Sequence, residues 1–77
     1  MQLDIISPEK TIYSGLAEVV TLPGINGSFT ILEQHAPIIS ILTEGVITYR
    51  NEGNVFSVKI NGGFIEMNQN NITVCIE

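Results

Sequence analysis

Hydrophobic and polar residues alternate along most of the chain, in short segments separated by polar or glycine-rich turns about every 8–12 residues. In the segment 55–60, for example, Phe56, Val58 and Ile60 alternate with Ser57 and Lys59. A period of two residues is typical of a β-strand with one buried face. Strands are therefore predicted at Gln2–Ile6, Lys10–Ser14, Leu16–Leu22, Ser28–Leu32, Ile38–Leu42, Val46–Arg50, Val55–Ile60, Gly62–Met67 and Ile72–Ile76.

The segments between these strands carry turn chemistry. Pro8 fixes its own φ, which suits the turn Ser7-Pro8-Glu9, and Asn26-Gly27 is a dipeptide typical of tight turns with φ > 0. Polar loops at 51–54 and 68–71 each join two strands into a hairpin. No amphipathic helix, linker or internal repeat is evident. The pattern predicts an all-β fold, an antiparallel β-sandwich or flattened barrel, formed by the single domain 1–77. In this fold Phe29 and Ile31 share a face, and Ile72, Val74 and Ile76 face inward.

Composition and charge exclude several classes of function. Eight acidic and three basic residues give a net charge of −5, which argues against nucleic-acid binding and against direct attraction to anionic lipid. No apolar run is long enough for a membrane span, so no direct membrane insertion is expected. Hydrophobic residues nevertheless make up 44% of this short chain. A small domain has much surface for its volume, so not all of these hydrophobic side chains can be buried inside it. Some of them are therefore expected at an interface.

The segment Ile38–Leu42 is the strongest candidate for that interface. Ile38, Ser40 and Leu42 fall on one face of the predicted strand, and Ile39 and Ile41 fall on the other. Both faces are therefore largely apolar, although the outer face of a strand in a two-layer sandwich is normally hydrated. We expect Ile39 and Ile41 to contact a partner protein. The alternative is local: the ends of a short strand tuck under the loop His35-Ala36-Pro37.

Candidate residues for chemistry are few. His35 is the single histidine, and neither a second histidine nor a cysteine accompanies it, so no metal site and no catalytic group can be assembled around it. Gly24 and Gly27 are not followed by the lysine of a phosphate-binding loop. Cys75 is the only cysteine, which excludes an internal disulfide. The sequence therefore predicts a protein that is not an enzyme and that needs no cofactor.

Five motifs, in their order and spacing, carry a resemblance to a known family. They are Ser7-Pro8-Glu9-Lys10, Tyr13-Ser14-Gly15, the stretch from Pro23 to Ser40 with its His35-Ala36-Pro37 element, Thr43-Glu44-Gly45, and Gly62-Gly63-Phe64-Ile65-Glu66. From about Leu3 to Ile76 the chain resembles the β-domain of the epsilon subunit of F-type ATP synthase, which is called delta in mitochondria. The resemblance implies a β-sandwich of about ten short strands.

The resemblance also implies a mechanical function. In the family this domain is part of the rotating central stalk, where it packs on the gamma subunit and rests on the polar loops of the c-ring. It couples ion-driven rotation to ATP synthesis without catalysing a reaction. The complex would place it peripherally, at the cytoplasmic face of the bacterial inner membrane. By resemblance, Ser7, His35 and Ser40 would lie near gamma, together with the apolar Ile39 and Ile41, and the turn formed by Asn26, Gly27 and Ser28 would point to the c-ring.

The chain departs from the family pattern at three places. Some relatives have a glutamate where this chain has Ser28, so a hydroxyl group replaces a charge at the expected c-ring contact. Glu33-Gln34 replaces a proline-containing pair, which removes a rigid residue from the loop before His35. Many bacterial epsilon subunits also continue into an inhibitory helical hairpin, and this 77-residue chain is expected to lack hairpin-based inhibition. The alternative to the rotor function is a free-standing small β-barrel that binds a peptide or a small apolar ligand.

Overall fold

The computed structural model describes residues 1–77 and contains nine β-strands and no helix. The strands are β1 (Gln2–Ile6), β2 (Thr11–Leu16), β3 (Val19–Gly24), β4 (Gly27–Leu32), β5 (Ile38–Leu42), β6 (Gly45–Asn51), β7 (Asn54–Ile60), β8 (Gly63–Asn68) and β9 (Asn71–Ile76). Every strand predicted from the alternation is present, and the total is nine where the resemblance implied about ten. The largest boundary change is at Leu16, which continues β2 because it pairs with Gln2 of β1.

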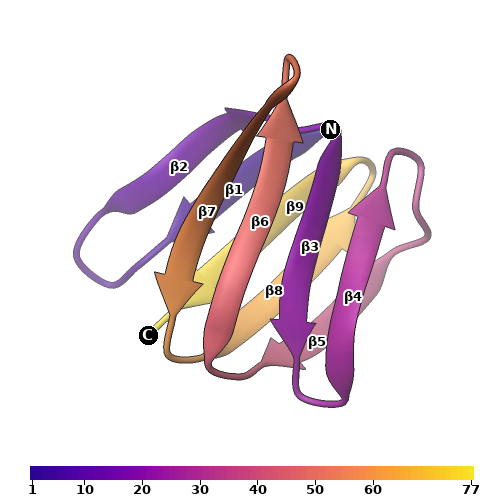
Figure 1. The fold of residues 1–77 in the computed structure, drawn as a ribbon. Helices are drawn as coiled ribbons and strands as arrows, with labels where there is room; N and C mark the ends of the chain where they lie inside the picture. The colour runs from indigo at the N-terminus through magenta and orange to yellow at the C-terminus, as the bar shows by residue number, and fades with distance from the viewer.

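The strands form two layers that are one curled sheet (Figure 1). The back layer has the order β2-β1-β9-β8-β5, and the front layer has the order β4-β3-β6-β7. All pairs are antiparallel except β1 with β9, which are parallel and bring Leu3 opposite Ile72. The antiparallel sandwich is therefore confirmed with one parallel pair, which joins the first and last strands of the chain.

The two layers are joined where β3 meets β5. Gly24 pairs with Leu42, the Ile25 N–H donates to the Ile41 carbonyl at 3.0 Å, and the Thr43 N–H donates to the Pro23 carbonyl at 2.9 Å. At Gly24 a Cβ atom would lie 2.6 Å from the Gly27 carbonyl oxygen, so only glycine allows this close approach. The junction places the β3–β4 turn beside the end of β5.

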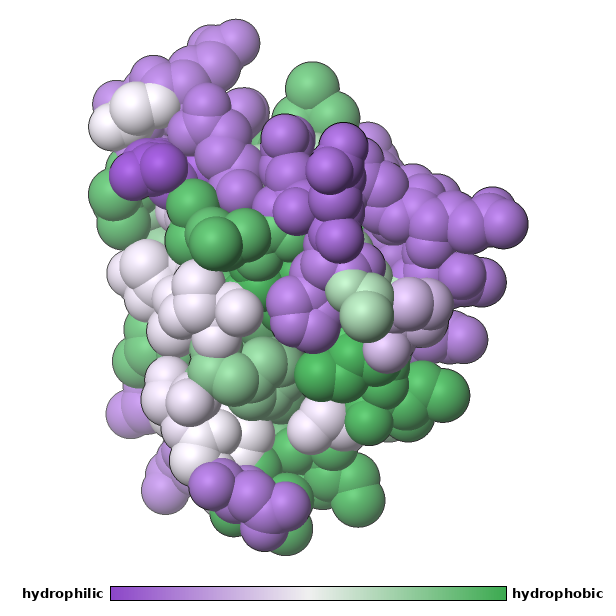
Figure 2. Space-filling view, turned by 90° about the vertical axis from the view of Figure 1, so that its right-hand side faces the viewer, coloured by the Kyte–Doolittle hydropathy of each residue, from purple (hydrophilic) through white to green (hydrophobic).

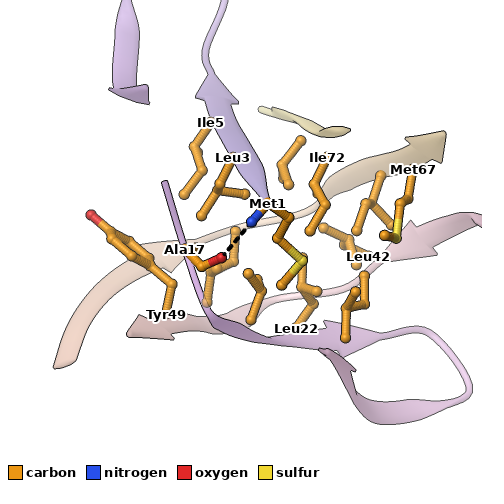
Figure 3. Close-up of a cluster of buried hydrophobic side chains, with 14 of the residues drawn as sticks. Met1, Leu3, Ile5, Ala17, Leu22, Leu42, Tyr49, Met67 and Ile72 are labelled. Carbon is orange, nitrogen blue, oxygen red and sulfur yellow. Dashed lines mark hydrogen bonds between the residues drawn. The ribbon is translucent and has the colours of Figure 1, made fainter. Parts of the chain in front are cut away.

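The core lies between the two layers and is built from the inward face of every strand except β2, whose Ile12 and Tyr13 pack against it (Figure 3). Its fully buried members include Leu3, Ile5, Val20, Leu22, Ile31, Ile47, Ile65, Met67, Ile72 and Val74. The inward orientation predicted for Ile72 and Val74 is confirmed, and the partly buried Ile76 packs against the same core. Phe29 and Ile31 share one face, as predicted, and the structure shows that this is the inner face. Phe56, by contrast, remains exposed because β7 is an edge strand.

Aromatic side chains close the seam between the edge strands β2 and β7, which do not pair with each other. The rings of Tyr13 and Tyr49 have centroids 4.4 Å apart, and those of Tyr49 and Phe56 are 5.3 Å apart. The Tyr13 hydroxyl donates to the Leu16 carbonyl at 2.8 Å, and a Cβ atom at Gly15 would lie 2.7 Å from that hydroxyl. The Tyr13-Ser14-Gly15 motif therefore has a structural reason: Gly15 leaves room for the tyrosine ring.

Candidate interaction site

The outer face of the back layer carries a continuous line of apolar side chains. Register pairs Ile41 of β5 with Phe64 of β8, Phe64 with Cys75 of β9, and Cys75 with Ile6 of β1. Ile41 is 60% exposed and Phe64 is 51% exposed, whereas their chain neighbours Leu42 and Ile65 are buried. We call Ile6, Ile41, Phe64 and Cys75 the apolar row. It is unusual because solvent-facing positions of a sandwich are normally polar.

A shallow groove of about 490 Å³ runs along part of the apolar row. Its lining residues are Ile6, Ser7, Pro8, Gly63, Phe64, Cys75, Ile76 and Glu77. Ser7, one of the predicted contact residues, stands at this groove in a fixed turn. Its hydroxyl donates to the Lys10 carbonyl at 3.0 Å and accepts the Lys10 N–H at 3.2 Å. The structure therefore brings Ser7 to the same groove as Phe64, near the row that includes Ile41.

The next outward row along the same layer is polar apart from Ile39, which is 79% exposed. Ile39 pairs with Glu66, and this row continues through Thr73 and Asp4 to Ser14. The Ser14 hydroxyl donates to an Asp4 carboxylate oxygen at 2.6 Å. The exposure of Ile39 shows that the local alternative, in which a loop covers this face of β5, is wrong. The predicted orientation of Ile39 and Ile41 away from the core is confirmed.

Two of the predicted contact residues lie away from the apolar row. Ser40 is on the inward face of β5, opposite the buried Ile65, so it does not share a face with Ile39 and Ile41. His35 is exposed in the loop before β5, and its Nδ1 atom lies 2.7 Å from the Ala36 carbonyl oxygen. Ser7 follows the carboxyl end of β1, which lies in the same row as Ile41 near the carboxyl end of β5. His35 lies before the amino end of β5. The length of a five-residue strand, about 13 Å, therefore separates the two ends of the predicted site.

The predicted c-ring turn lies at the same end of the molecule as the apolar row. Asn26, Gly27 and Ser28 are exposed in and after the β3–β4 turn, and Gly27 has φ = 124°, which residues with a side chain rarely adopt. The adjacent Ile25 is 61% exposed and is hydrogen-bonded through its backbone to Ile41. In the view onto the β4 and β5 side, hydrophobic surface gathers in the lower half, below a hydrophilic upper half (Figure 2). The turn and the apolar row are thus neighbouring surfaces.

Neither a metal-binding cluster nor a membrane-spanning helix is present. No group of three or more histidine, cysteine, aspartate or glutamate side chains is placed to hold a metal ion. The structure contains no helix that could cross a bilayer. All buried polar side-chain atoms have hydrogen-bond partners.

Comparison with known sequences identifies the family. The family described as the ATP synthase delta/epsilon chain, β-sandwich domain, matches residues 1–77. The chain belongs to this family. Among curated relatives, the ATP synthase epsilon chain of Desulfitobacterium hafniense is 43% identical over 72 residues, which are 94% of this chain and 54% of the relative. That of Symbiobacterium thermophilum is 41% identical over 75 residues, which are 96% of this chain and 54% of the relative. The chain thus spans about half the length of these relatives.

Solved structures agree on the fold. A chain of the Euglena gracilis mitochondrial ATP synthase, determined as an assembly of OSCP, F1 and c-ring, aligns with a TM-score of 0.90 at 19% identity, covering 96% of this chain and 48% of that one. A chain of the Tetrahymena thermophila mitochondrial ATP synthase central stalk and c-ring aligns with a TM-score of 0.82 at 13% identity, covering 97% and 61%. At these identities the likeness establishes the β-sandwich alone.

Sequence reasoning missed three of the four residues of the apolar row. Phe64, Cys75 and Ile6 lie on different strands, and each is an ordinary outward position when its own strand is considered alone. Alternation identified Ile41 because both faces of β5 are apolar. Each of the other three is an outward-facing apolar residue near one end of its strand, and this pattern could have indicated an exposed apolar site. Only the cross-strand register shows that the three residues are adjacent.

Proposed function

We propose that this chain is the β-sandwich part of a rotor-stalk subunit of an F-type ATP synthase. It would transmit rotation between the c-ring and the gamma subunit without catalysing a reaction itself. Membership of the delta/epsilon chain family of ATP synthase supports the proposal. The single observation in this molecule that carries it is the exposed apolar row, which offers a binding surface where a free-standing sandwich would be polar.

The proposed gamma contact is centred on the apolar row and extends to Ile39 and Ser7. His35 would form a second contact at the other end of β5, because it is exposed in the loop that precedes this strand. Ser40 would support the interface from the inward side of β5. A close-packed β-sandwich suits this role, since a dense interior transmits strain with little deformation.

The proposed c-ring contact is the turn formed by Asn26, Gly27 and Ser28. These residues are exposed, and the turn is anchored by the backbone hydrogen bonds that join β3 to β5. Ser28 would contribute a hydroxyl hydrogen bond to a polar loop of the ring. Force applied at this turn would pass through the Gly24–Leu42 junction directly into the strand that carries Ile41. The chain would thus act peripherally, at the cytoplasmic face of the bacterial inner membrane, through its protein partners.

A co-elution experiment tests this function. The chain is mixed with the gamma subunit of its own organism and analysed by size-exclusion chromatography, alongside the variants Ile41→Asp and Thr48→Asp. Thr48 is an outward residue of the front layer and is the matched control. We expect a one-to-one complex that Ile41→Asp weakens by about 2–5 kcal/mol, because a charge would be desolvated without a partner. Thr48→Asp should bind normally.

The outcomes separate function from fold. Circular dichroism must first show that both variants keep the β-sandwich. A folded Ile41→Asp variant with unchanged affinity would show that gamma binds another surface, and the absence of any complex with folded gamma would reject the proposed partner. The alternative, a small ligand-binding barrel, has less support because core side chains occupy the space between the layers. Such a ligand would have to bind in the surface groove.

A further inference from the structure

The tripeptide Ile-Asn-Gly occurs twice in the chain, as residues 25–27 and as residues 60–62. The dipeptide Asn-Gly is prone to spontaneous loss of the asparagine side-chain amide, because glycine has no side chain to hinder its own backbone nitrogen. Every other asparagine of the chain is followed by a residue that has a side chain. Since the two copies share the same local sequence, a difference in their reactivity must come from the fold.

The first copy forms the β3–β4 turn at one end of the molecule (Figure 1). Ile25 is 61% exposed, and Asn26 and Gly27 are exposed as well. No atom beyond the chain neighbours of Gly27 lies within 4 Å of the position that a Cβ atom would take there. The backbone nitrogen of Gly27 therefore belongs to an open turn that is accessible to water.

The second copy joins β7 to β8 and is packed against the sheet. Ile60 is 2% exposed and Gly62 is buried. A Cβ atom at Gly62 would lie 3.6 Å from the Leu42 carbonyl oxygen, and the next residue, Gly63, is paired with Leu42 in the sheet. Asn61 is itself exposed, but the backbone nitrogen that follows it belongs to a buried residue.

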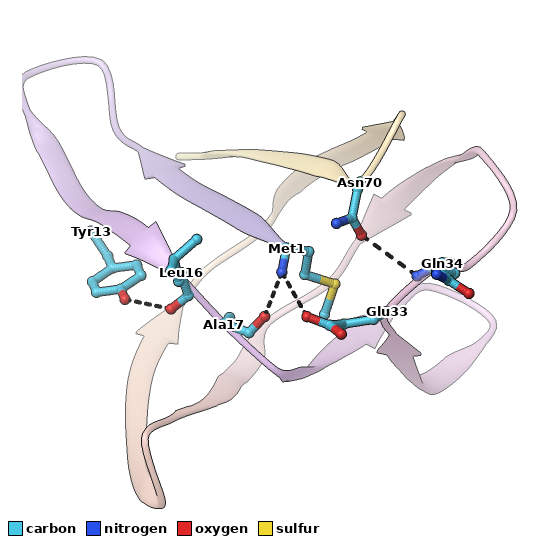
Figure 4. A network of polar contacts seen from close by, with 7 residues as sticks. All are labelled: Met1, Tyr13, Leu16, Ala17, Glu33, Gln34 and Asn70. Carbon is cyan, nitrogen blue, oxygen red and sulfur yellow. Dashed lines mark hydrogen bonds and ion pairs between the residues drawn. The ribbon is translucent and has the colours of Figure 1, made fainter.

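Asparagine side chains at the opposite end of the molecule are held by hydrogen bonds. In the β8–β9 turn the Oδ1 atom of Asn70 accepts the Gln34 N–H at 3.5 Å (Figure 4). The Nδ2 atom of Asn71 donates to the Gln69 carbonyl at 3.3 Å. Both asparagines also precede residues with side chains. The β3–β4 turn thus combines an exposed asparagine with an exposed glycine.

The loss of the amide proceeds through a cyclic imide. The backbone nitrogen of Gly27 gives its proton to a base in the solvent and attacks the Cγ atom of Asn26. A bond forms between these two atoms, the bond from Cγ to the amide nitrogen breaks, and that nitrogen leaves as ammonia. Water then opens the five-membered ring at one of its two carbonyl groups, which gives aspartate or isoaspartate. The ring closes only where side chain and backbone can rotate, which packing prevents.

We propose that Asn26 is a site of spontaneous deamidation and that the fold protects Asn61, although both lie in the same tripeptide. The β3–β4 hairpin, residues 19–32, contains no charged side chain. The modification would therefore give the hairpin its first negative charge, at the tip and beside the exposed Ile25. The turn would change from neutral to anionic with the age of the molecule. This inference goes beyond the proposed rotor function, and it holds whichever partner the turn contacts.

Peptide mass spectrometry measures the reaction at each copy separately. The folded chain is incubated in mildly alkaline buffer, and the replacement of the amide by a carboxyl group is followed with time at Asn26 and at Asn61. We expect the reaction at Asn26 to be at least about tenfold faster, since reaction at Asn61 requires local opening and a factor of ten corresponds to about 1.4 kcal/mol. In guanidinium chloride the two rates should become similar, because the tripeptides are identical.

Matched variants assign the mass change of the intact chain to one site. Glutamine would have to close a larger ring, so it loses ammonia more slowly than asparagine does. Asn26→Gln should therefore remove most of the mass change, and Asn61→Gln should leave it unaltered. Circular dichroism shows whether both variants keep the β-sandwich.

Two results would overturn the proposal. The first is an equal or faster reaction at Asn61 in the folded chain. The second is a preference for Asn26 that persists unchanged in guanidinium chloride, because it would then come from neighbouring residues and not from the fold. Both measurements use the unaltered chain, so they do not depend on the folding of a variant. Neither involves gamma or the c-ring, so this proposal and the proposed function can fail separately.

Discussion

The outer faces of the two layers have the same backbone geometry, but one cross-strand line on each differs in chemistry. On the back layer the central outward residues are the apolar row, Ile6, Ile41, Phe64 and Cys75. On the front layer the corresponding cross-strand line consists of hydroxyl residues, Thr21, Thr30, Thr48 and Ser57. Thr21 and Thr30 are hydrogen-bonded through their Oγ1 atoms at 3.0 Å, and Arg50 pairs with Glu18 on the same side.

The comparison shows which features the fold requires. Threonine suits a β-strand as well as isoleucine does, and cross-strand hydroxyl pairs stabilise a sheet without an adhesive surface. One cross-strand line of the front layer is therefore built from hydroxyl residues, while Leu32, Val46 and Val55 are exposed elsewhere on its outer face. Since hydroxyl residues can occupy such a line, the fold alone does not require the isoleucine and phenylalanine side chains of the apolar row. We infer that the apolar row serves binding, and the following predictions test this difference between the layers.

The largest predicted effect is a difference in the free energy of unfolding between substitutions on the inner and outer faces of β8. Ile65 is fully buried and the adjacent Phe64 is half exposed on the other face of β8. Ile65→Ala should lower the free energy of unfolding by about 2–5 kcal/mol, through lost burial and a cavity. Phe64→Ala should cost only about 0.5 kcal/mol. Urea unfolding measures both, and equal losses would mean that the apolar row is part of the structural core.

A second pair of substitutions compares glycines of the two layers. Gly63 begins β8 with φ = 151°, and a Cβ atom there would collide with the Cys75 carbonyl oxygen. Gly53, in the turn before β7, has φ = 80° but open space around it. Gly63→Ala should therefore lower the free energy of unfolding by about 1–3 kcal/mol, and Gly53→Ala should lower it by less. A larger loss at Gly53 would show that backbone strain outweighs the collision.

Exchanging the chemistry of the two outer faces should change association more than stability. Phe64→Thr and Thr48→Phe each replace a solvent-facing residue, so each should shift the free energy of unfolding by no more than about 0.5 kcal/mol. Phe64→Thr should weaken gamma binding, measured by size-exclusion chromatography, because it interrupts the apolar row. Thr48→Phe should leave gamma binding unchanged. Tighter gamma binding in Thr48→Phe would show that general hydrophobicity, rather than position, determines recognition.

The smallest predicted effect concerns Tyr49, in the aromatic seam between β2 and β7. Burial raises the pKa of the Tyr49 phenol above its ordinary value, and the nearby Tyr13 raises this pKa further. In the folded state Tyr49 thus keeps its proton at pH values where the unfolded chain loses it. This contribution to stability is complete below about pH 10, the ordinary value, and is lost as the pH rises through the folded-state pKa. Urea midpoints should fall above pH 10, and less steeply in Tyr49→Phe.

The amino-acid sequence by itself determined the local features of this protein. The alternation of apolar and polar residues placed all nine strands, oriented Ile39 and Ile41 away from Ser40, and put Phe29 and Ile31 on one face of their strand. The motifs around Tyr13 and His35 indicated the family, which the comparisons confirm. These features could be predicted because the period of a strand and the chemistry of a turn depend on residues that are close together in the chain.

Only the tertiary structure decided which distant residues meet. The apolar row requires the register of β5, β8, β9 and β1, and a shift of one residue in any strand would turn its side chain inward. The parallel pairing of β1 with β9 and the separation of Ser7 from His35 likewise depend on how the sheet curls. Strand pairing joins segments far apart in the chain through backbone hydrogen bonds that are alike at every residue, so local sequence does not specify it.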